Sequence, residues 1–246
     1  MNVLYVHGFG GARGPVERAL ADVARDGPHA LLPVHWPSGD LREMRARAVV
    51  EVARKVAEQR SLPRGLMEAA LHGTRQASQA WEQAVANVPA GAAQLAAAIE
   101  AAHSTGKPTS ILAFSLGCRV VLYAIEAGVI APGSLVRIVF AASAAPASAY
   151  GGLPPVIEDG TRVVHVFSKK DAVLDRLYPV AAGVGTRPSG RSPLGVPGVE
   201  NVEVGVGHRG YRSIAQDLWR HATGDEASLL TGPGASAVLP RARPRG

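Results

Sequence analysis

The chain has 246 residues, of which 47% are hydrophobic and 19% are charged, a composition typical of a globular protein and not of a disordered or membrane-spanning one. Its formal net charge is +6, but Arg241, Arg243 and Arg245 lie in a Gly- and Pro-rich segment, residues 224–246, that we expect to be a disordered tail. The other basic residues are scattered among acidic ones instead of forming a stripe, which argues against nucleic-acid binding.

Short apolar, β-branched runs alternate along the chain with segments whose apolar residues recur at helical spacing. The expected strands are residues 2–6, 29–34, 109–114, 135–142, 162–167 and 199–206. The expected helices are residues 15–25, 41–59, 66–103 with a break near Pro89–Gly91, 118–127, 171–180 and 211–222. The Ala-, Gly- and Pro-rich residues 143–159 and 184–198 are expected to be loops.

This order of strands and helices predicts the fold class. Strands that alternate with helices imply right-handed crossovers and a parallel sheet. We therefore expect an α/β fold with a compact, mostly parallel sheet of about six strands, in one domain over residues 1–223. Residues 41–107 are much longer than one crossover needs, so we expect them to form a helical insertion.

The third expected strand runs directly into Ala113-Phe114-Ser115-Leu116-Gly117 and then into a helix. A serine hydroxyl is a poor nucleophile, so it must be held exposed on rigid backbone beside a base. Small residues two before and two after the serine allow the sharp strand-to-helix turn on which α/β-hydrolases hold their nucleophile. We predict that Ser115 is a nucleophile, with a helix-capping serine as the simpler alternative.

The loop after the first expected strand reads His7-Gly8-Phe9-Gly10. In the α/β-hydrolase fold this loop gives one of the two backbone N–H groups that bind the oxyanion of the reaction, and the residue after the nucleophile gives the other. We predict Phe9 and Leu116 as these donors. Gly8 would let the backbone approach the substrate closely, whereas a tight turn alone is the simpler alternative and His7 is expected to buttress the loop.

The general base of such a site lies at the end of the last strand, and the acid precedes it in sequence. His208 is the only histidine in that place, directly after the last expected strand. Asp171 follows the fifth expected strand and would hold the tautomer of the imidazole. Asp175 lies one helical turn further on, so it is the alternative acid if Asp171 only caps its helix.

Other conspicuous residues receive a structural interpretation. Cys118 is the only cysteine, so no intrachain disulfide can form, and we expect it to be a small core residue. The tryptophans are expected to anchor the core, although Trp36 lies in a loop where it could contact substrate. No histidine spacing suggests a metal site, and the sequence predicts no cofactor. Because it shows neither a secretory signal nor a membrane-spanning run, we expect a cytoplasmic protein without an integral membrane segment.

Four stretches, residues 4–9, 114–120, 168–178 and 207–211, resemble the little-characterised α/β-hydrolase-like family that includes the transmembrane and coiled-coil domain proteins. The most distinctive is Ser-x-x-Asp-x-Val-Leu-x-x-x-Tyr over residues 168–178. The resemblance spans residues 2–222, and it implies the hydrolase fold with a triad of Ser115, Asp171 and His208. Members often carry Gly at the position of Ala113 and often carry membrane segments.

These residues together predict a serine hydrolase that cleaves a carboxylic ester by acyl transfer to water, in the manner of esterases and lipases. The apolar content of the helical insertion favours an ester of modest or lipid-like size over a charged substrate. A thioesterase or an amidase would use the same residues. The alternative from another class is a catalytically silent hydrolase fold whose long helices bind a protein partner.

Overall fold

The computed structural model describes residues 1–10, 13–39, 78–182 and 186–225. Within them, six strands form one sheet in the order β2-β1-β3-β4-β5-β6. The strands are β1 (Asn2–Val6), β2 (Ala30–Val34), β3 (Thr109–Phe114), β4 (Arg137–Ala141), β5 (Arg162–Phe167) and β6 (Val199–Glu203). Every neighbouring pair is parallel, so the carboxyl ends of all six strands meet at one edge of the sheet.

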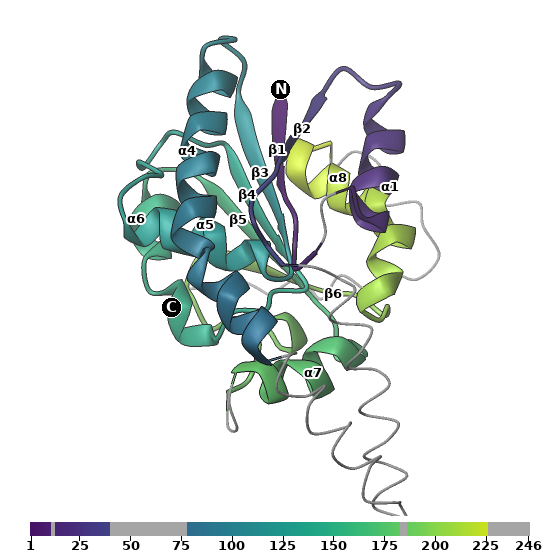
Figure 1. Cartoon of the computed structure of the whole chain (residues 1–246). Helices are drawn as coiled ribbons and strands as arrows, with labels where there is room; N and C mark the ends of the chain where they lie inside the picture. The colour runs from purple at the N-terminus through teal and green to yellow at the C-terminus, as the bar shows by residue number, and fades with distance from the viewer. Residues whose placement is uncertain (11–12, 40–77, 183–185, 226–246) are drawn as a thin grey trace, which may run out of the picture.

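Helices cover both faces of the sheet. Figure 1 shows α4, α5 and α6 on one face and α1 with α8 on the other, while α7 lies beyond the carboxyl ends of the strands. The bounds are α1 (Pro15–Ala24), α4 (Val88–His103), α5 (Gly117–Glu126), α6 (Leu153–Glu158), α7 (Ala172–Ala182) and α8 (Ala215–Thr223). Three short 3₁₀ helices are η1 (Ala147–Tyr150), η2 (Ser189–Arg191) and η3 (His208–Ile214). This is the three-layer arrangement of the α/β-hydrolase fold, and the predicted fold class is confirmed.

The central strands are buried because both of their faces meet helices. All five residues of β1 and all six of β3 are buried, and their apolar, β-branched sequences suit a parallel strand that is covered twice. β6 lies at the edge of the sheet and contains only partly buried and exposed residues. The most continuous apolar runs of the sequence therefore lie at the centre of the sheet.

Two local predictions are wrong, and the predicted break in the long helical region is displaced by a few residues. Pro89–Gly91 do not break a helix but lie in the first turn of α4, where proline is tolerated because its missing N–H would lack a partner there. The break lies at Asn87, after a helical segment at residues 78–86. Residues 143–159 are not simply a loop, since they contain η1 and α6. The last strand ends at Glu203, earlier than expected.

Most of the expected helical insertion, residues 40–77, lies outside the described residues, and so does all but the start of the expected tail. The helical character of residues 78–86 and 88–103 agrees with the prediction. Each helix of the described ranges is too short or too polar to cross a bilayer.

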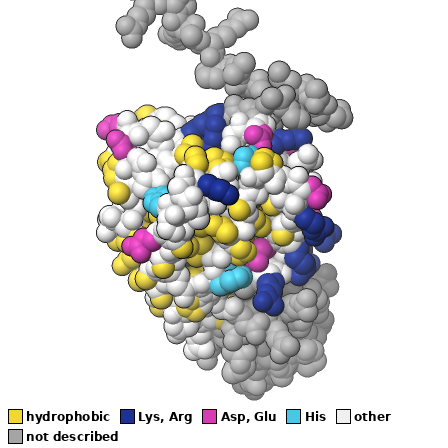
Figure 2. Space-filling view, turned by 90° about the horizontal axis from the view of Figure 1, so that it is seen from above, with side chains coloured by type: hydrophobic (Ala, Val, Ile, Leu, Met, Phe, Trp, Pro, Cys, Tyr) yellow, Lys and Arg dark blue, Asp and Glu magenta, His cyan; other side chains and the backbone are white. Residues whose placement is uncertain are grey.

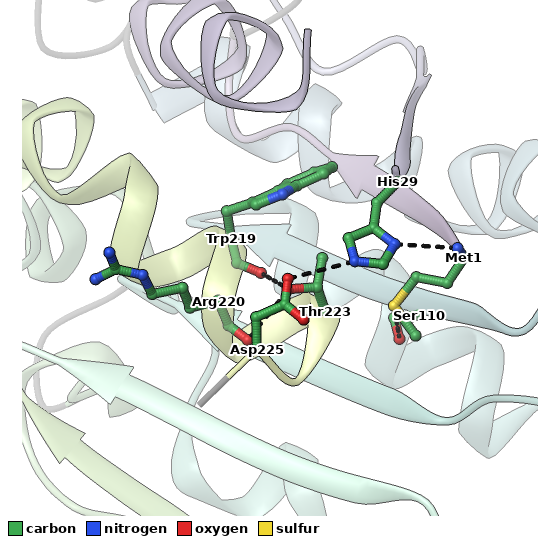
Figure 3. A network of polar contacts seen from close by, with 7 residues as sticks. All are labelled: Met1, His29, Ser110, Trp219, Arg220, Thr223 and Asp225. Atoms are coloured by element: carbon green, nitrogen blue, oxygen red, sulfur yellow. Dashed lines mark hydrogen bonds and ion pairs between the residues drawn. The ribbon is translucent and has the colours of Figure 1, made fainter. Parts of the chain in front are cut away.

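The amino ends of the strands lie at the opposite edge of the sheet, where His29 precedes β2. Its Nδ1 accepts a hydrogen bond from the Met1 amino group at 3.1 Å, and its Nε2 faces an Asp225 carboxylate oxygen at 3.3 Å (Figure 3). The space-filling view from this side shows hydrophobic side chains interspersed with charges of both signs (Figure 2). His29 therefore joins the start of the chain to the residues after α8.

Candidate active site

Ser115 lies at the sharp turn between β3 and α5. Its φ is +53°, a backbone conformation that is strained for any residue with a side chain. Its N–H donates to Ala141 O at 2.9 Å, and its carbonyl accepts from the N–H groups of Cys118 and Ala144 at 3.2 and 3.1 Å. These bonds to the end of β4 and the loop after it hold the strained turn in place, and they present Ser115 on rigid backbone.

Two glycines permit this turn beside β1. A Cβ at Gly117 would lie 2.3 Å from the carbonyl oxygen of Val6, which is backbone and has little freedom to move away. A Cβ at Gly8 would lie 2.8 Å from Ser115 Cβ and 3.3 Å from Ser115 Oγ. Since β1 and β3 are paired, with Val6 opposite Ala113, the loop after β1 lies directly against the serine. The glycines on either side of the serine side chain are therefore steric requirements of the site.

His208 and Asp171, 37 residues apart in sequence, form a hydrogen bond of 2.7 Å from the imidazole Nδ1 to a carboxylate oxygen, Oδ2. The Asp171 side chain is fully buried, and 16% of the His208 side chain is exposed. Because an ionised carboxylate only accepts hydrogen bonds, Nδ1 carries the proton and Nε2 is left as the basic nitrogen. Ser168 connects the loop after β5, which carries Asp171, to the segment after β6, which leads to His208, since its Oγ donates to Val206 O at 2.5 Å.

The same aspartate also caps α7. The second carboxylate oxygen of Asp171, Oδ1, accepts from the Leu174 N–H at 3.0 Å, so the capping role considered for Asp171 coexists with its contact to the imidazole. Asp175 instead forms an ion pair with Arg191. Of the two aspartates, Asp171 is therefore the one placed behind the His208 ring.

The His208 ring lies against the residue before the serine, with its centroid 5.0 Å from that of the Phe114 ring. Within the described residues, no hydrogen bond joins His208 Nε2 to Ser115 Oγ. Such contacts are often long in proteins without substrate and tighten when the reacting complex forms. The structure thus brings Asp171 and His208 into direct contact and holds the ring beside the turn that carries Ser115.

The two predicted oxyanion donors lie on the two segments that meet at Ser115. Leu116 immediately precedes α5, where backbone N–H groups have no intrahelical acceptor. Phe9 follows Gly8 in the loop after β1, and its ring is buried against Gly39 and stacked on Trp81 at 6.2 Å. The backbone at both positions is therefore anchored by buried side chains.

His7 supports the loop after β1 through hydrogen bonds, as expected. Burial lowers the pKa of its imidazole, which therefore stays neutral. Nδ1 donates to Gly8 O at 2.8 Å, and Nε2 accepts from the Trp36 N–H at 3.4 Å. The indole N–H of Trp36 donates to His7 O at 2.9 Å, and its side chain is only 5% exposed. Trp36 is therefore packed in the core against His7, and its contact with substrate stays a prediction.

Cys118 is fully buried, and its Sγ contacts the carbonyl oxygens of Ala113 and Ala141 at 3.5 and 3.7 Å. Burial raises the pKa of its thiol to about 12. A thiol that remains protonated at neutral pH is a poor nucleophile, so Cys118 is a core residue, as the sequence predicted.

One group beside the turn was not singled out from the sequence. Arg119 on α5 contacts Trp81 and Tyr178, two aromatic residues that come from distant parts of the chain. Arg119 comes four residues after Ser115, which is about one helical turn, and this spacing is the signal that could have drawn attention to it. Among the described residues, no three His, Cys, Asp or Glu side chains are close enough together to hold a metal ion.

No protein-family model and no curated protein matches the chain. A solved structure from Xanthomonas campestris pv. campestris, described as a candidate hydrolase of the alpha/beta superfamily, is 18% identical over 92% of this chain and 98% of that one, with a TM-score of 0.46. An uncharacterized protein from Bacillus cereus ATCC 10987 is 13% identical, over 91% of this chain and 59% of that one, with a TM-score of 0.44. Likenesses this distant carry no argument about function, which must come from the site itself.

Proposed function

We propose that this protein is a serine hydrolase that cleaves carboxylic esters through an acyl-enzyme intermediate, with Ser115 as nucleophile, His208 as general base and Asp171 as the acid behind the base. The observation that carries the proposal is the 2.7 Å hydrogen bond between His208 Nδ1 and the buried Asp171 carboxylate, beside a serine held at positive φ. Strained backbone of this kind persists where the surrounding structure enforces it, and such residues cluster at functional sites.

In the first half of the reaction, His208 Nε2 accepts the proton of Ser115 Oγ while the oxygen attacks the ester carbonyl carbon. The carbonyl π electrons move to oxygen, and the Phe9 and Leu116 N–H groups stabilise the resulting oxyanion. When the carbonyl re-forms, the bond to the alkoxide breaks and His208 gives that leaving group its proton. The acyl group is then an ester of Ser115.

In the second half, a water molecule takes the place of the alcohol. His208 removes one proton from this water as it attacks the acyl carbon, and the second tetrahedral intermediate collapses with release of the carboxylic acid. Ser115 Oγ leaves with the proton that His208 held, so the enzyme returns to its starting state. Throughout, the buried Asp171 carboxylate stabilises the imidazolium without taking its proton.

Labelling with a fluorophosphonate probe tests the proposal, since this reagent phosphonylates activated serines. We expect labelling of the wild type at Ser115, loss of labelling in Ser115→Ala, and normal labelling in Ser213→Ala, a matched change at an exposed serine. Circular dichroism shows whether each variant is folded. A folded wild type that resists the probe would overturn the proposal and favour a silent fold that serves as an interaction module.

The class of acyl substrate follows from a panel of p-nitrophenyl esters of increasing chain length, run beside acyl thioesters and amides. We expect turnover of esters, and loss of it in Ser115→Ala. Cleavage of amides or thioesters without ester cleavage would place the protein in a different class of serine hydrolase.

A further inference from the structure

Arg119 lies in the turn of α5 that follows the serine, and its guanidinium is fixed on several sides. Nε donates to Ala144 O at 2.8 Å, and one terminal nitrogen, Nη2, donates to the Tyr178 hydroxyl at 2.9 Å. The guanidinium carbon lies 6.0 Å from the ring centroid of Trp81 and 5.9 Å from that of Tyr178. At such distances the faces of aromatic rings attract a cation. The position of this charge is therefore set before any ligand binds.

The positive charge of Arg119 has no carboxylate partner in the described part of the chain. The half-buried side chain contacts the carbonyl oxygen of Ala144, the hydroxyl of Tyr178, and the rings of Trp81 and Tyr178. A guanidinium has five N–H donors, of which two are used here. Buried charges are ordinarily paired, so a fixed and unpaired guanidinium with free donors is suited to receive an anionic group.

Arg119 is connected to the reacting centre from two directions. Ala144, whose carbonyl accepts from Arg119, donates its own N–H to Ser115 O at 3.1 Å. On the other side, Trp81 stacks on Phe9 at 6.2 Å, and Phe9 is one of the two proposed oxyanion donors. One intermediate residue therefore joins the guanidinium to Ser115, and another joins it to the loop that carries Phe9.

We propose that Arg119 is a specificity-determining residue that binds a carboxylate on the substrate, so that the preferred esters carry an anionic group. This inference rests on the proposed function. A charged hydrogen bond to a planar, preorganised guanidinium is stronger than a neutral one, and its fork matches the two oxygens of a carboxylate. The ester bond is cleaved at Ser115, while the far end of the same molecule is held by Arg119.

This substrate class differs from the one expected from composition. The apolar character of residues 41–107 favours neutral acyl chains, but most of that segment lies outside the described residues. One contact away from Ser115, through Ala144, the structure instead places a cation against the rings of Trp81 and Tyr178.

The test compares two esters that differ only in this charge: the p-nitrophenyl monoester of adipic acid, and p-nitrophenyl hexanoate, in which a methyl group replaces the carboxylate. For the wild type we expect kcat/KM about tenfold or more higher for the adipate ester, as one charged hydrogen bond would give. Arg119→Gln should abolish this preference mainly by raising KM, whereas Arg119→Lys should retain part of it. Arg25→Gln, the same change at an exposed arginine on the far side of the sheet, should retain it fully.

The outcomes separate this inference from the proposed function. If the wild type is labelled at Ser115 and cleaves both esters equally, the inference is wrong and the hydrolase assignment stands. If Arg119→Gln lowers both rates by the same factor, Arg119 is only a structural strut, and the inference again fails. If the wild type neither reacts with the probe nor cleaves either ester, the proposed function itself falls.

A measurement on the wild type alone covers the case in which the Arg119 variants do not fold. Adipate should slow fluorophosphonate labelling of Ser115, whereas adipamide, its neutral analogue of nearly the same shape, should slow it at least about tenfold less per unit concentration. Equal protection by the two compounds would contradict a carboxylate site.

Discussion

His208 and His29 each face a carboxylate, at opposite edges of the same sheet. His208, beyond the carboxyl ends of the strands, donates from Nδ1 to Asp171, whose side chain is fully buried. His29, at the amino ends, faces Asp225, whose side chain is 62% exposed, and its second nitrogen is occupied by the Met1 amino group (Figure 3). In the part of the chain that the structure describes, Nε2 of His208 has no such partner.

The difference shows that a histidine–carboxylate contact is not in itself an active site. An ion pair with an exposed carboxylate contributes little to stability, because water competes for that carboxylate. A ring whose two nitrogens are both hydrogen-bonded also has no free lone pair with which to act as a base. His208 differs in having a desolvated acid, one unoccupied nitrogen and a strained serine nearby. These three properties together carry the functional assignment.

The largest expected effect comes from removing each histidine in turn. His208→Ala should lower kcat for ester hydrolysis by at least about 10⁴-fold, because the serine loses its base. His29→Ala should leave kcat within about twofold and lower the free energy of unfolding by less than about 1 kcal/mol, because water competes for the exposed Asp225 carboxylate. Steady-state kinetics and urea unfolding of the two variants decide this. If the two variants lost activity equally, the two histidine–carboxylate pairs would not differ in function, contrary to the proposal.

The second effect concerns which of the two carboxylates, Asp171 or Asp175, supports the His208 imidazole. Asp171→Asn should lower kcat by about 10⁴-fold, since an amide no longer fixes the productive tautomer of His208, while its carbonyl oxygen can still cap α7. Asp175→Asn changes a carboxylate that pairs with Arg191, and we expect less than a tenfold loss. Kinetics at saturating ester would show the opposite ranking if Asp175 were the true acid.

The third effect concerns the strained turn that carries Ser115 at the carboxyl edge of the sheet. Gly117→Ala places a methyl group 2.3 Å from Val6 O, so we expect a loss of about 1–3 kcal/mol of stability from overpacking, together with impaired labelling of Ser115. Gly195→Ala is the matched control, because a Cβ there meets nothing within 4 Å. Urea unfolding should leave that control within about 0.5 kcal/mol of the wild type.

The smallest effect is on the pH dependence of stability, and it concerns two further histidines, His7 and His165. Both rings are buried, and burial lowers their pKa because it disfavours the charged form. The unfolded chain takes up protons near the ordinary value of 6.5, whereas the folded chain does so only at lower pH. Stability should therefore be complete above pH 6.5 and fall as the pH drops below it, with a slope of at most about 1.4 kcal/mol per pH unit for each ring.

Urea unfolding between pH 5 and 8 measures this slope. His165→Gln should reduce it, whereas His103→Gln, at an exposed helix end, should not change it. A slope that is the same in wild type and His165→Gln would exclude a buried neutral ring at position 165.

Much of the sheet could be predicted because its strands are apolar runs long enough to be read without knowledge of their neighbours. The short helix α6 could not, because its six residues include two prolines and depend on burial of Leu153 and Val156 against the rest of the protein. Helices this short are not stable by themselves. Local sequence therefore indicates the strands and the longer helices, but not a short helix that depends on packing.

In the candidate site, too, some features could be predicted from the sequence and others depend on the folded structure. The chain order of serine, acid and histidine was visible in the sequence, but the choice between Asp171 and Asp175 was not, because the two lie one turn apart on the same segment. That choice depends on Arg191, 16 residues away from Asp175, which pairs with it. The place of Arg119 between Trp81 and Tyr178 depends likewise on contacts that only the folded chain makes.

Under the proposed mechanism, the two hydrogen bonds of the Asp171 carboxylate link catalysis to local opening of α7. One oxygen closes the first turn of α7 through the Leu174 amide, and the other holds the imidazole. When this turn opens, the carboxylate gains freedom to rotate and the ring loses its fixed orientation in the same event. The amide of Leu174 is thereby a natural reporter, and its exchange with deuterium would follow the fraction of molecules that are ready to react.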